Sequence, residues 1–279
     1  MPIPARTVEV MPARLTSEDL SDLAEAVRLL ESNSLASRLT RLFGRQIETL
    51  GRVLPAPARK VVALATESAL KVALRVALRS LGDKPPGKAS NRLHMFASAA
   101  SGAVGGAFGL PALAIELPVS ATILLRSIAD IAREQGEDLS TPEAALACIE
   151  VFALGGHAPG EAALEGGYFA VRAGLAQTVS ESARFMLRQG LAGEAAPALV
   201  KMTSKVAARF GVAVSEKLVA QAMPLVGAVG GAAVNAAFAV HFQTMARGHF
   251  IVRRLERIHG EDIVCFEFER LRNATLLHA

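Results

Sequence analysis

The sequence predicts an all-α fold, a multi-helix bundle with two central glycine-rich apolar helices. Long apolar segments carry helix-start and helix-stop signals, and strand-like alternation is hard to find. In addition, the hexapeptide GAVGGA occurs at residues 102–107 and again at 227–232. Glycines at helical spacing let two backbones approach closely, which offsets their cost of roughly 1 kcal/mol per position. The predicted packing positions are Gly102, Gly106, Gly109, Gly227 and Gly231.

The composition is compatible with two environments for this helix pair, the core of a soluble protein and a lipid bilayer. The chain has 279 residues, of which 51% are hydrophobic and 20% charged. That is apolar for a soluble protein but short of a polytopic membrane protein. Tryptophan is absent and Tyr168 is the only tyrosine, so an aromatic belt at a bilayer interface is poorly supplied.

The organisation predicted from these features is a flexible tail over residues 1–15 and a single helical domain over 16–279. The N-terminal segment has neither an apolar core nor a cleavage site, so it does not resemble a secretory signal. Cys148 and Cys265 stand apart in sequence and have no metal-binding spacing, which suits a reducing compartment. We therefore expect cytoplasmic residence, with attachment to the inner face of the membrane as the open alternative.

The first two helices follow from caps and apolar spacing. Thr16 and Asp19 have capping-box spacing and predict a helix start. An amphipathic helix is expected over residues 35–53, ended by a Pro-Ala-Pro sequence. Its basic stripe contains Arg38, Arg41, Arg45 and Arg52.

A third, largely buried helix is predicted over residues 58–81. Between Arg38 and Arg92, twelve Lys or Arg residues are opposed by three acids. This charge suits either an ordinary solvated face or the surface of an anionic membrane, where each cation contributes about 1 kcal/mol. Nucleic acid is not expected as a partner, because no stacking aromatic residues are interleaved with the cations.

The next segment is uncharged from Leu93 to Ile115 but contains Pro111. We expect one helix over residues 93–109, a break, and a second helix that begins near Pro118 and ends at Gly136. On that second helix Arg126 and Asp130 are four residues apart, so an ion pair between them is predicted.

The C-terminal half predicts five further helices. Thr141-Pro142 is a strong helix start, and the glycine pair 155–156 marks the end of that helix. The remaining helices are expected over residues 168–188, 197–210 (a short one), 224–259 and 261–277.

The two GAVGGA copies place an ionisable residue at matching positions. With an offset of 125 residues, Glu116 in the first copy falls on His241 in the second. In parallel helices the two would be level and could act as general acid, general base or metal ligands. In antiparallel helices they would lie at opposite ends. The structural alternatives are a satisfied buried carboxylate and a hydrogen-bonded core histidine.

Tyr168 and Arg172 share a helix face and suit an interhelical anchor better than a site. None of the standard catalytic, nucleotide-binding or metal-binding motifs is present, so no catalytic residue, metal or cofactor is predicted.

Three segments together resemble a known family. They are GAFGLPALAIELPVSATILLRSIADIAREQGEDLSTPEAALACIEVFALGG, then GYFAVR at 167–172, then PLVGAVGG at 224–231 followed by Asn235, Ala246 and Phe250. In this order they resemble the EcsC protein family over roughly residues 92–257. The resemblance implies a bacterial helical protein and carries over no catalytic residue. The family takes its name from a hydrophobic protein encoded beside an ABC-type exporter.

Three functions follow as hypotheses. The first is a non-enzymatic helical protein associated with a membrane, with anionic lipid or with a hydrophobic ligand, and with a membrane transporter as a further candidate partner. The second is a soluble hydrolase or ligand-binding protein with an apolar pocket lined by Glu116 and His241. The third is a structural module that binds a partner protein. The sequence predicts no oligomeric state.

Overall fold

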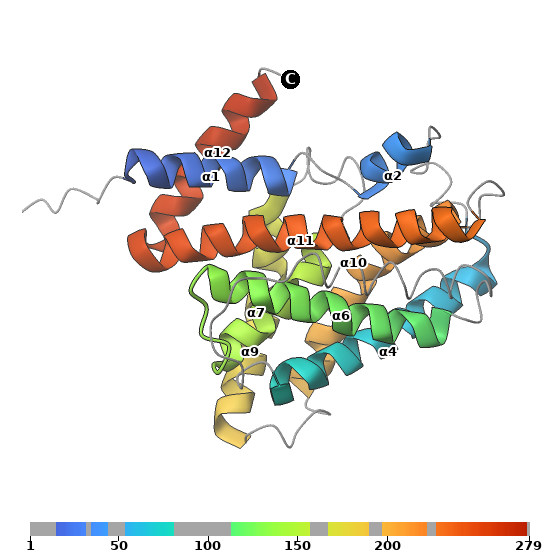
Figure 1. The fold of residues 1–279 in the computed structure, drawn as a ribbon. Helices are drawn as coiled ribbons and strands as arrows, with labels where there is room; N and C mark the ends of the chain where they lie inside the picture. Colours follow the sequence, from blue (N-terminus) through green and yellow to red (C-terminus); the bar gives the residue numbers. More distant parts are fainter. Residues whose placement is uncertain are drawn as a thin grey trace, which may run out of the picture.

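The computed structural model describes residues 15–31, 35–43, 54–80, 113–156, 167–189, 197–221 and 227–277. Within these ranges the chain forms nine helices and no strand, so the all-α prediction is confirmed (Figure 1). The helices are α1 (Ser17–Glu31), α2 (Leu35–Phe43), α4 (Ala56–Ser80), α6 (Leu113–Glu134), α7 (Pro142–Leu154), α9 (Gly167–Gln189), α10 (Pro197–Gln221), α11 (Gly227–His259) and α12 (Glu261–Leu277).

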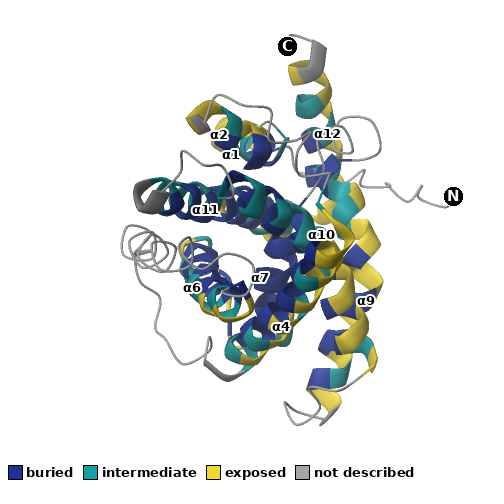
Figure 2. Cartoon of the chain, turned by 90° about the vertical axis from the view of Figure 1, so that its right-hand side faces the viewer, coloured by how far each residue is buried: buried dark blue, intermediate teal, exposed yellow. Residues whose placement is uncertain are grey.

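The long helix α11 runs through the middle of the bundle. It packs against α1 and α2 on one side and against α6, α7 and α10 on the other, while α12 folds back across its C-terminal end (Figure 1). Helix α4 lies on the outer side of α6, and α9 and α10 complete the layer beside α7 (Figure 2). This arrangement buries α11 along most of its length, whereas one face of α9 and the outer face of α4 are exposed.

Helix α7 packs against α4, α6, α9, α10 and α11 and, apart from Glu143 and Glu150, carries only apolar side chains. Every residue from Ala144 to Leu154 is buried, as expected for a helix without a polar face. Phe152 of α7 packs on Phe210 of α10, with ring centroids 4.9 Å apart, and on Phe242 of α11 at 5.6 Å. These edge-on and tilted aromatic contacts join three helices at the centre of the core.

Helix ends agree with the local signals. Thr16 Oγ1 accepts a hydrogen bond from the Asp19 N–H at 3.1 Å, and Asp19 Oδ2 accepts one from the Thr16 N–H at 3.2 Å, which is a reciprocal capping box. Thr141 caps α7 by accepting from the Ala144 N–H at 3.3 Å. Gly136 and Gly260 adopt positive φ angles of 78° and 91° after α6 and α11, a conformation that favours glycine. The predicted helices over 168–188 and 261–277 are also confirmed.

Two predicted helix boundaries were wrong. Helix α10 does not end near Gly211 but continues to Gln221, because its second half packs against neighbouring helices and buries residues such as Val214 and Lys217. Helix α6 begins at Leu113, so Pro118 lies inside it, where the buried Leu113 and Leu117 anchor the first turns. Leu15, the last residue of the predicted tail, is buried.

The first of the two predicted glycine-rich helices lies outside the described residues, whereas the second corresponds to α11. Gly102, Gly106 and Gly109 thus lie outside the described residues, as do Arg45 and Arg52 of the basic stripe. The second GAVGGA copy forms the first turns of α11, and Gly231 is buried there. In the part of the chain that the structure describes, no helix combines the length and apolarity needed to cross a bilayer.

Candidate functional site

Helices α6 and α11 lie side by side and run in the same direction. Three contacts along their length show a nearly constant separation in sequence: Glu116 with Asn235, 119 residues apart, Ser127 with Gln243, 116 apart, and Glu137 with Arg253, also 116 apart. The parallel arrangement considered from the sequence is therefore present, but its register is 116–119 residues instead of 125.

This register separates the two residues that the repeat had matched. Glu116 is level with Asn235, and His241 lies six residues further along α11, about 9 Å along the axis. The partners of the two residues also differ. Lys217 Nζ donates to Glu116 Oε1 at 2.6 Å, and His241 Nε2 donates to the Gly155 carbonyl at the end of α7 at 2.8 Å. These contacts fit the structural alternatives, an ion-paired buried carboxylate and a core histidine.

Arg126 and Asp130 remain a predicted pair on α6. The carboxylate of Asp130 accepts a hydrogen bond from Arg133 at 2.8 Å, three residues further along the same helix. Asp130 therefore has a second candidate partner that the spacing of four residues did not indicate.

Tyr168 is an interhelical anchor. Its hydroxyl lies 2.9 Å from His249 Nδ1 on α11, and its N–H donates to Glu31 of α1 at 3.0 Å. Burial lowers the pKa of His249 well below its usual range, and the nearby guanidinium groups of Arg172 and Arg253 act in the same direction. The imidazole is therefore neutral at physiological pH, and the pair acts as a buried hydrogen bond that fixes α9 against α11.

Arg172 lies one helical turn after Tyr168 and also contacts α11. It donates to Glu256 of α11 at 2.5 Å and lies over the Tyr168 ring, with 5.4 Å between the guanidinium carbon and the ring centroid. Arg172 thus belongs both to the anchor and to the wall of a cleft that begins there.

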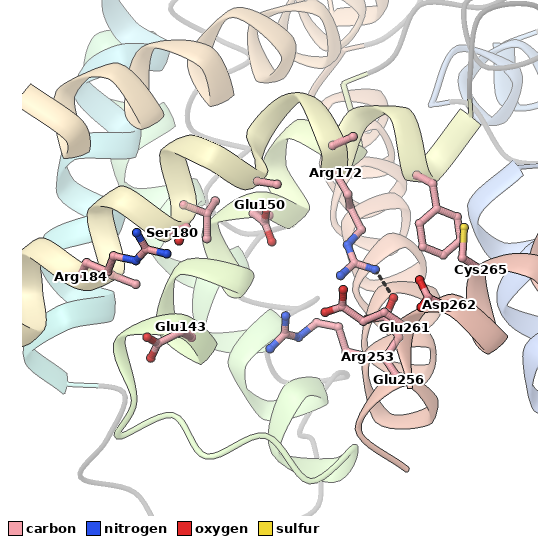
Figure 3. Close-up of a pocket in the computed structure, with 15 residues that line it drawn as sticks. Glu143, Glu150, Arg172, Ser180, Arg184, Arg253, Glu256, Glu261, Asp262 and Cys265 are labelled. Atoms are coloured by element: carbon pink, nitrogen blue, oxygen red, sulfur yellow. Dashed lines mark hydrogen bonds and ion pairs between the residues drawn. The ribbon is translucent and has the colours of Figure 1, made fainter. Parts of the chain in front are cut away.

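The cleft lies between α7, α9 and the corner where α11 meets α12, and it has a volume of about 520 Å³ (Figure 3). Helix α9 contributes an apolar wall, and the floor and rim are charged. The apolar lining residues are Phe169, Ala173, Ala176, Val179 and Ala183, and the polar ones are Glu143, Glu150, Arg172, Ser180, Arg184, Arg253, Glu256, Glu261, Asp262 and Cys265.

Glu150 is at the floor of this cleft and is only 6% exposed. Figure 3 shows its carboxylate projecting from α7 into the space between α9 and α11. Burial raises the pKa of Glu150 to about 7; Arg172 and Arg253 oppose this rise, and Glu256 adds to it. The side chain is therefore balanced between its neutral and charged forms near physiological pH, which is typical of functional carboxyl groups.

Sequence reasoning missed Glu150, Lys217 and Arg253. A signal was present for Glu150, because it is the only charged residue after the first turn of a helix that is otherwise apolar on all sides. An isolated carboxyl in such a helix must be buried and must find a counter-charge, a proton or a ligand. For Lys217 and Arg253 the partners lie more than one hundred residues away, and no local pattern indicates them.

The described residues were also compared with the side-chain clusters that bind metal ions. Among the described residues, no group of three or more His, Cys, Asp or Glu side chains is arranged to hold a metal ion.

Comparison with known proteins identifies the family. The model of the EcsC protein family matches residues 17–255, which include all of the helices from α1 to α10 and nearly all of α11. The chain belongs to the EcsC protein family. No curated protein and no solved structure matches the chain. The family assignment confirms the resemblance of the three sequence segments.

Proposed function

We propose that this EcsC-family protein acts by binding, not by catalysis, and docks reversibly on an anionic membrane surface. The observation that supports this proposal is the charge and apolarity of one end of the bundle, formed by α2 and the first turns of α4 and α6, which we call the basic end. Figure 1 shows α2 and the N-termini of α4, α6 and α11 at that end.

The basic end combines cations with exposed apolar side chains. Arg41, Arg59 and Lys60 are exposed there, and Arg38 is half-buried and donates to Thr244 of α11 at 3.1 Å. Residues 35–43 and 54–66 contain no acid. The exposed apolar side chains near these cations are Leu42, Leu64, Ile115 and Val119, of which Ile115 is 76% exposed.

Such a surface suits the interface of a bilayer. Each cation near an anionic leaflet contributes about 1 kcal/mol, and each large apolar side chain that leaves water contributes about 1.5–3 kcal/mol. Helix N-termini carry partial positive charge and add to the attraction for phosphate headgroups. The sum corresponds to weak, salt-sensitive attachment, which differs from the insertion of a membrane-spanning helix.

Flotation of the full chain with lipid vesicles tests the proposal. We expect the protein to float with phosphatidylcholine vesicles that contain about 30% phosphatidylglycerol, and to be released at about 0.5 M salt. It should stay behind with vesicles of phosphatidylcholine alone. Recovery at the bottom of the gradient with both kinds of vesicle at low salt would contradict the proposal.

A pair of charge-reversal variants localises the contact. The double variant Arg41→Glu, Lys60→Glu changes two exposed cations of the basic end and should abolish flotation. Lys201→Glu reverses an exposed cation in the first turn of α10, away from the basic end, and should float like the parent protein. Equal loss in both variants would mean that overall charge, and not this surface, drives the attachment.

A further inference from the structure

The cleft between α7, α9 and the α11–α12 corner has a buried carboxyl group, Glu150, on its floor. Only 6% of Glu150 is exposed, yet it makes no hydrogen bond and no ion pair with any of the described residues. A buried carboxylate without a partner is costly, so such a position is retained only when the group is protonated or meets a ligand.

The two arginines nearest to Glu150 are already occupied. Arg172 pairs with Glu256 at 2.5 Å. Arg253 makes a two-pronged contact with Glu137, with Nε–Oε1 at 2.8 Å and Nη2–Oε2 at 3.2 Å. Bidentate pairing of this kind fixes the guanidinium plane. Arg172 and Arg253 therefore act on Glu150 only through their electrostatic field, and neither could pair directly with it or with an anionic ligand without breaking an existing pair.

Counting the charges of the lining gives the sign of the ligand. Five acids line the cleft (Glu143, Glu150, Glu256, Glu261, Asp262), against three arginines (Arg172, Arg184, Arg253), which is 3 − 5 = −2 when all are ionised. An anion would meet this excess of carboxylates. A cation would reduce it and would supply the missing partner at the floor.

The shape of the lining gives the class of the ligand. Helix α9 presents an apolar strip of Phe169 and small aliphatic side chains along one side of the cleft. We propose that this cleft binds a small organic cation, an ammonium or guanidinium group with a short apolar body, and that Glu150 is its counter-ion at the floor. The charged head donates to the Glu150 carboxylate, and the apolar body packs against α9.

Calorimetric titration of the full chain tests this assignment with n-hexylammonium, and with hexanol and hexanoate as neutral and anionic probes of similar size. We expect binding of the ammonium only, and tighter binding at about pH 8 than at about pH 6, on either side of the Glu150 pKa of about 7. The charged groups that face Glu150 are Arg172 on α9 and Arg253 and Glu256 on α11. Preference for hexanoate, or no binding of hexylammonium, would overturn the proposal.

The variant Glu150→Gln keeps the shape of the side chain and removes its charge. It should weaken hexylammonium binding about tenfold or more, as expected for the loss of one charge-assisted contact, and should remove the dependence on pH. Glu181→Gln is the matched control, because Glu181 is an exposed carboxylate of α9 that does not line the cleft. Equal affinity of the Glu150→Gln variant and the parent would overturn the assignment.

A second measurement needs no variant. Cys265 lines the cleft, so bound hexylammonium should slow its alkylation in the unaltered chain, and unchanged alkylation at saturating hexylammonium would count against the proposal.

Glu150 lies away from the basic end, so the Glu150→Gln variant should float with anionic vesicles like the parent. Failure of the cleft proposal and failure of the membrane proposal are therefore distinguishable.

Discussion

Lys217 of α10 and Glu116 of α6 form an ion pair inside the bundle, with 2.6 Å between Nζ and Oε1. The lysine side chain is completely buried and that of Glu116 is 9% exposed. Burial lowers the pKa of Lys217, and the carboxylate of Glu116 opposes this change. Ser120 donates to the same carboxylate oxygen at 3.0 Å, so the pair lies within a small polar network in an apolar core.

Replacement of Lys217 by Met should destabilise the protein by about 3–5 kcal/mol, because it leaves Glu116 charged and buried without its counter-ion. Urea unfolding followed by circular dichroism measures this loss, and it suits a chain without tryptophan. The control is Lys201→Met on the same helix, an exposed lysine whose removal should change the free energy of unfolding little.

A double variant tests whether the loss of stability comes from the unpaired charge of Glu116. Lys217→Met combined with Glu116→Gln should recover part of the lost stability, because neither charge then remains buried. If the single variant Lys217→Met were as stable as the parent, the ion pair would not contribute in the way its burial indicates.

Local signals in the sequence were sufficient for most of the fold. Caps such as Thr141 and stops such as Gly136 and Gly260 act within one helical turn, so a single sequence shows them. The end of α10 was missed because packing overrides the preference of Gly211: a Cβ built there would be 4.0 Å from Thr66 Oγ1 of α4, which shows how near α4 lies.

The site was harder to predict than the fold, because it depends on contacts between distant segments. The hexapeptide repeat left parallel and antiparallel packing of the two helices open and suggested an offset of 125 residues, whereas Ser127 contacts Gln243 at an offset of 116. At Glu116 the separation is 119 residues, so the residue level with it on α11 is Asn235, six residues before His241. Sequence identity between short glycine segments does not determine helix register, since side-chain packing along the whole interface does so.

Two glycines should respond to alanine with opposite signs. A Cβ on Gly156 would lie 1.9 Å from the backbone carbonyl oxygen of Arg209, so α7 and α10 would have to separate. We expect Gly156→Ala to destabilise the protein by about 2–3 kcal/mol. Gly174 lies within α9, and a Cβ added there would have no atom of another residue within 4 Å, so Gly174→Ala should stabilise by about 0.5–1 kcal/mol. Thermal unfolding of both variants measures the two signs, and a destabilised Gly174→Ala variant would contradict this assignment of open space.

The two cysteines should differ in reactivity. Cys148 is buried in α7, where burial and then Glu137 raise its thiol pKa, whereas Cys265 is partly exposed at the cleft. Burial, Glu269 and Glu256 also raise the pKa of Cys265, so its alkylation should accelerate as the pH rises above the usual thiol range. Mass spectrometry after iodoacetamide treatment should find modification at Cys265 in the folded protein and at both cysteines in urea. A Cys265→Ser variant should stay unmodified when folded, and labelling of folded Cys148 would show that α7 opens.

The buried carboxyl of Glu150 should make stability depend on pH. In the unfolded chain the group ionises near the ordinary glutamate pKa of 4.5, whereas in the folded protein its pKa is about 7 because of burial. The unfolded state therefore loses its proton first, and stability should fall by about 3 kcal/mol as the pH rises between these two values, then level off. The Gln side chain of the Glu150→Gln variant does not titrate in either state, so the stability of this variant should not fall over the same pH range. Urea unfolding of the parent and the variant between about pH 5 and about pH 8 compares the two slopes. Parallel curves would show that Glu150 ionises equally easily in both states, and the cleft would then have a permanently charged floor.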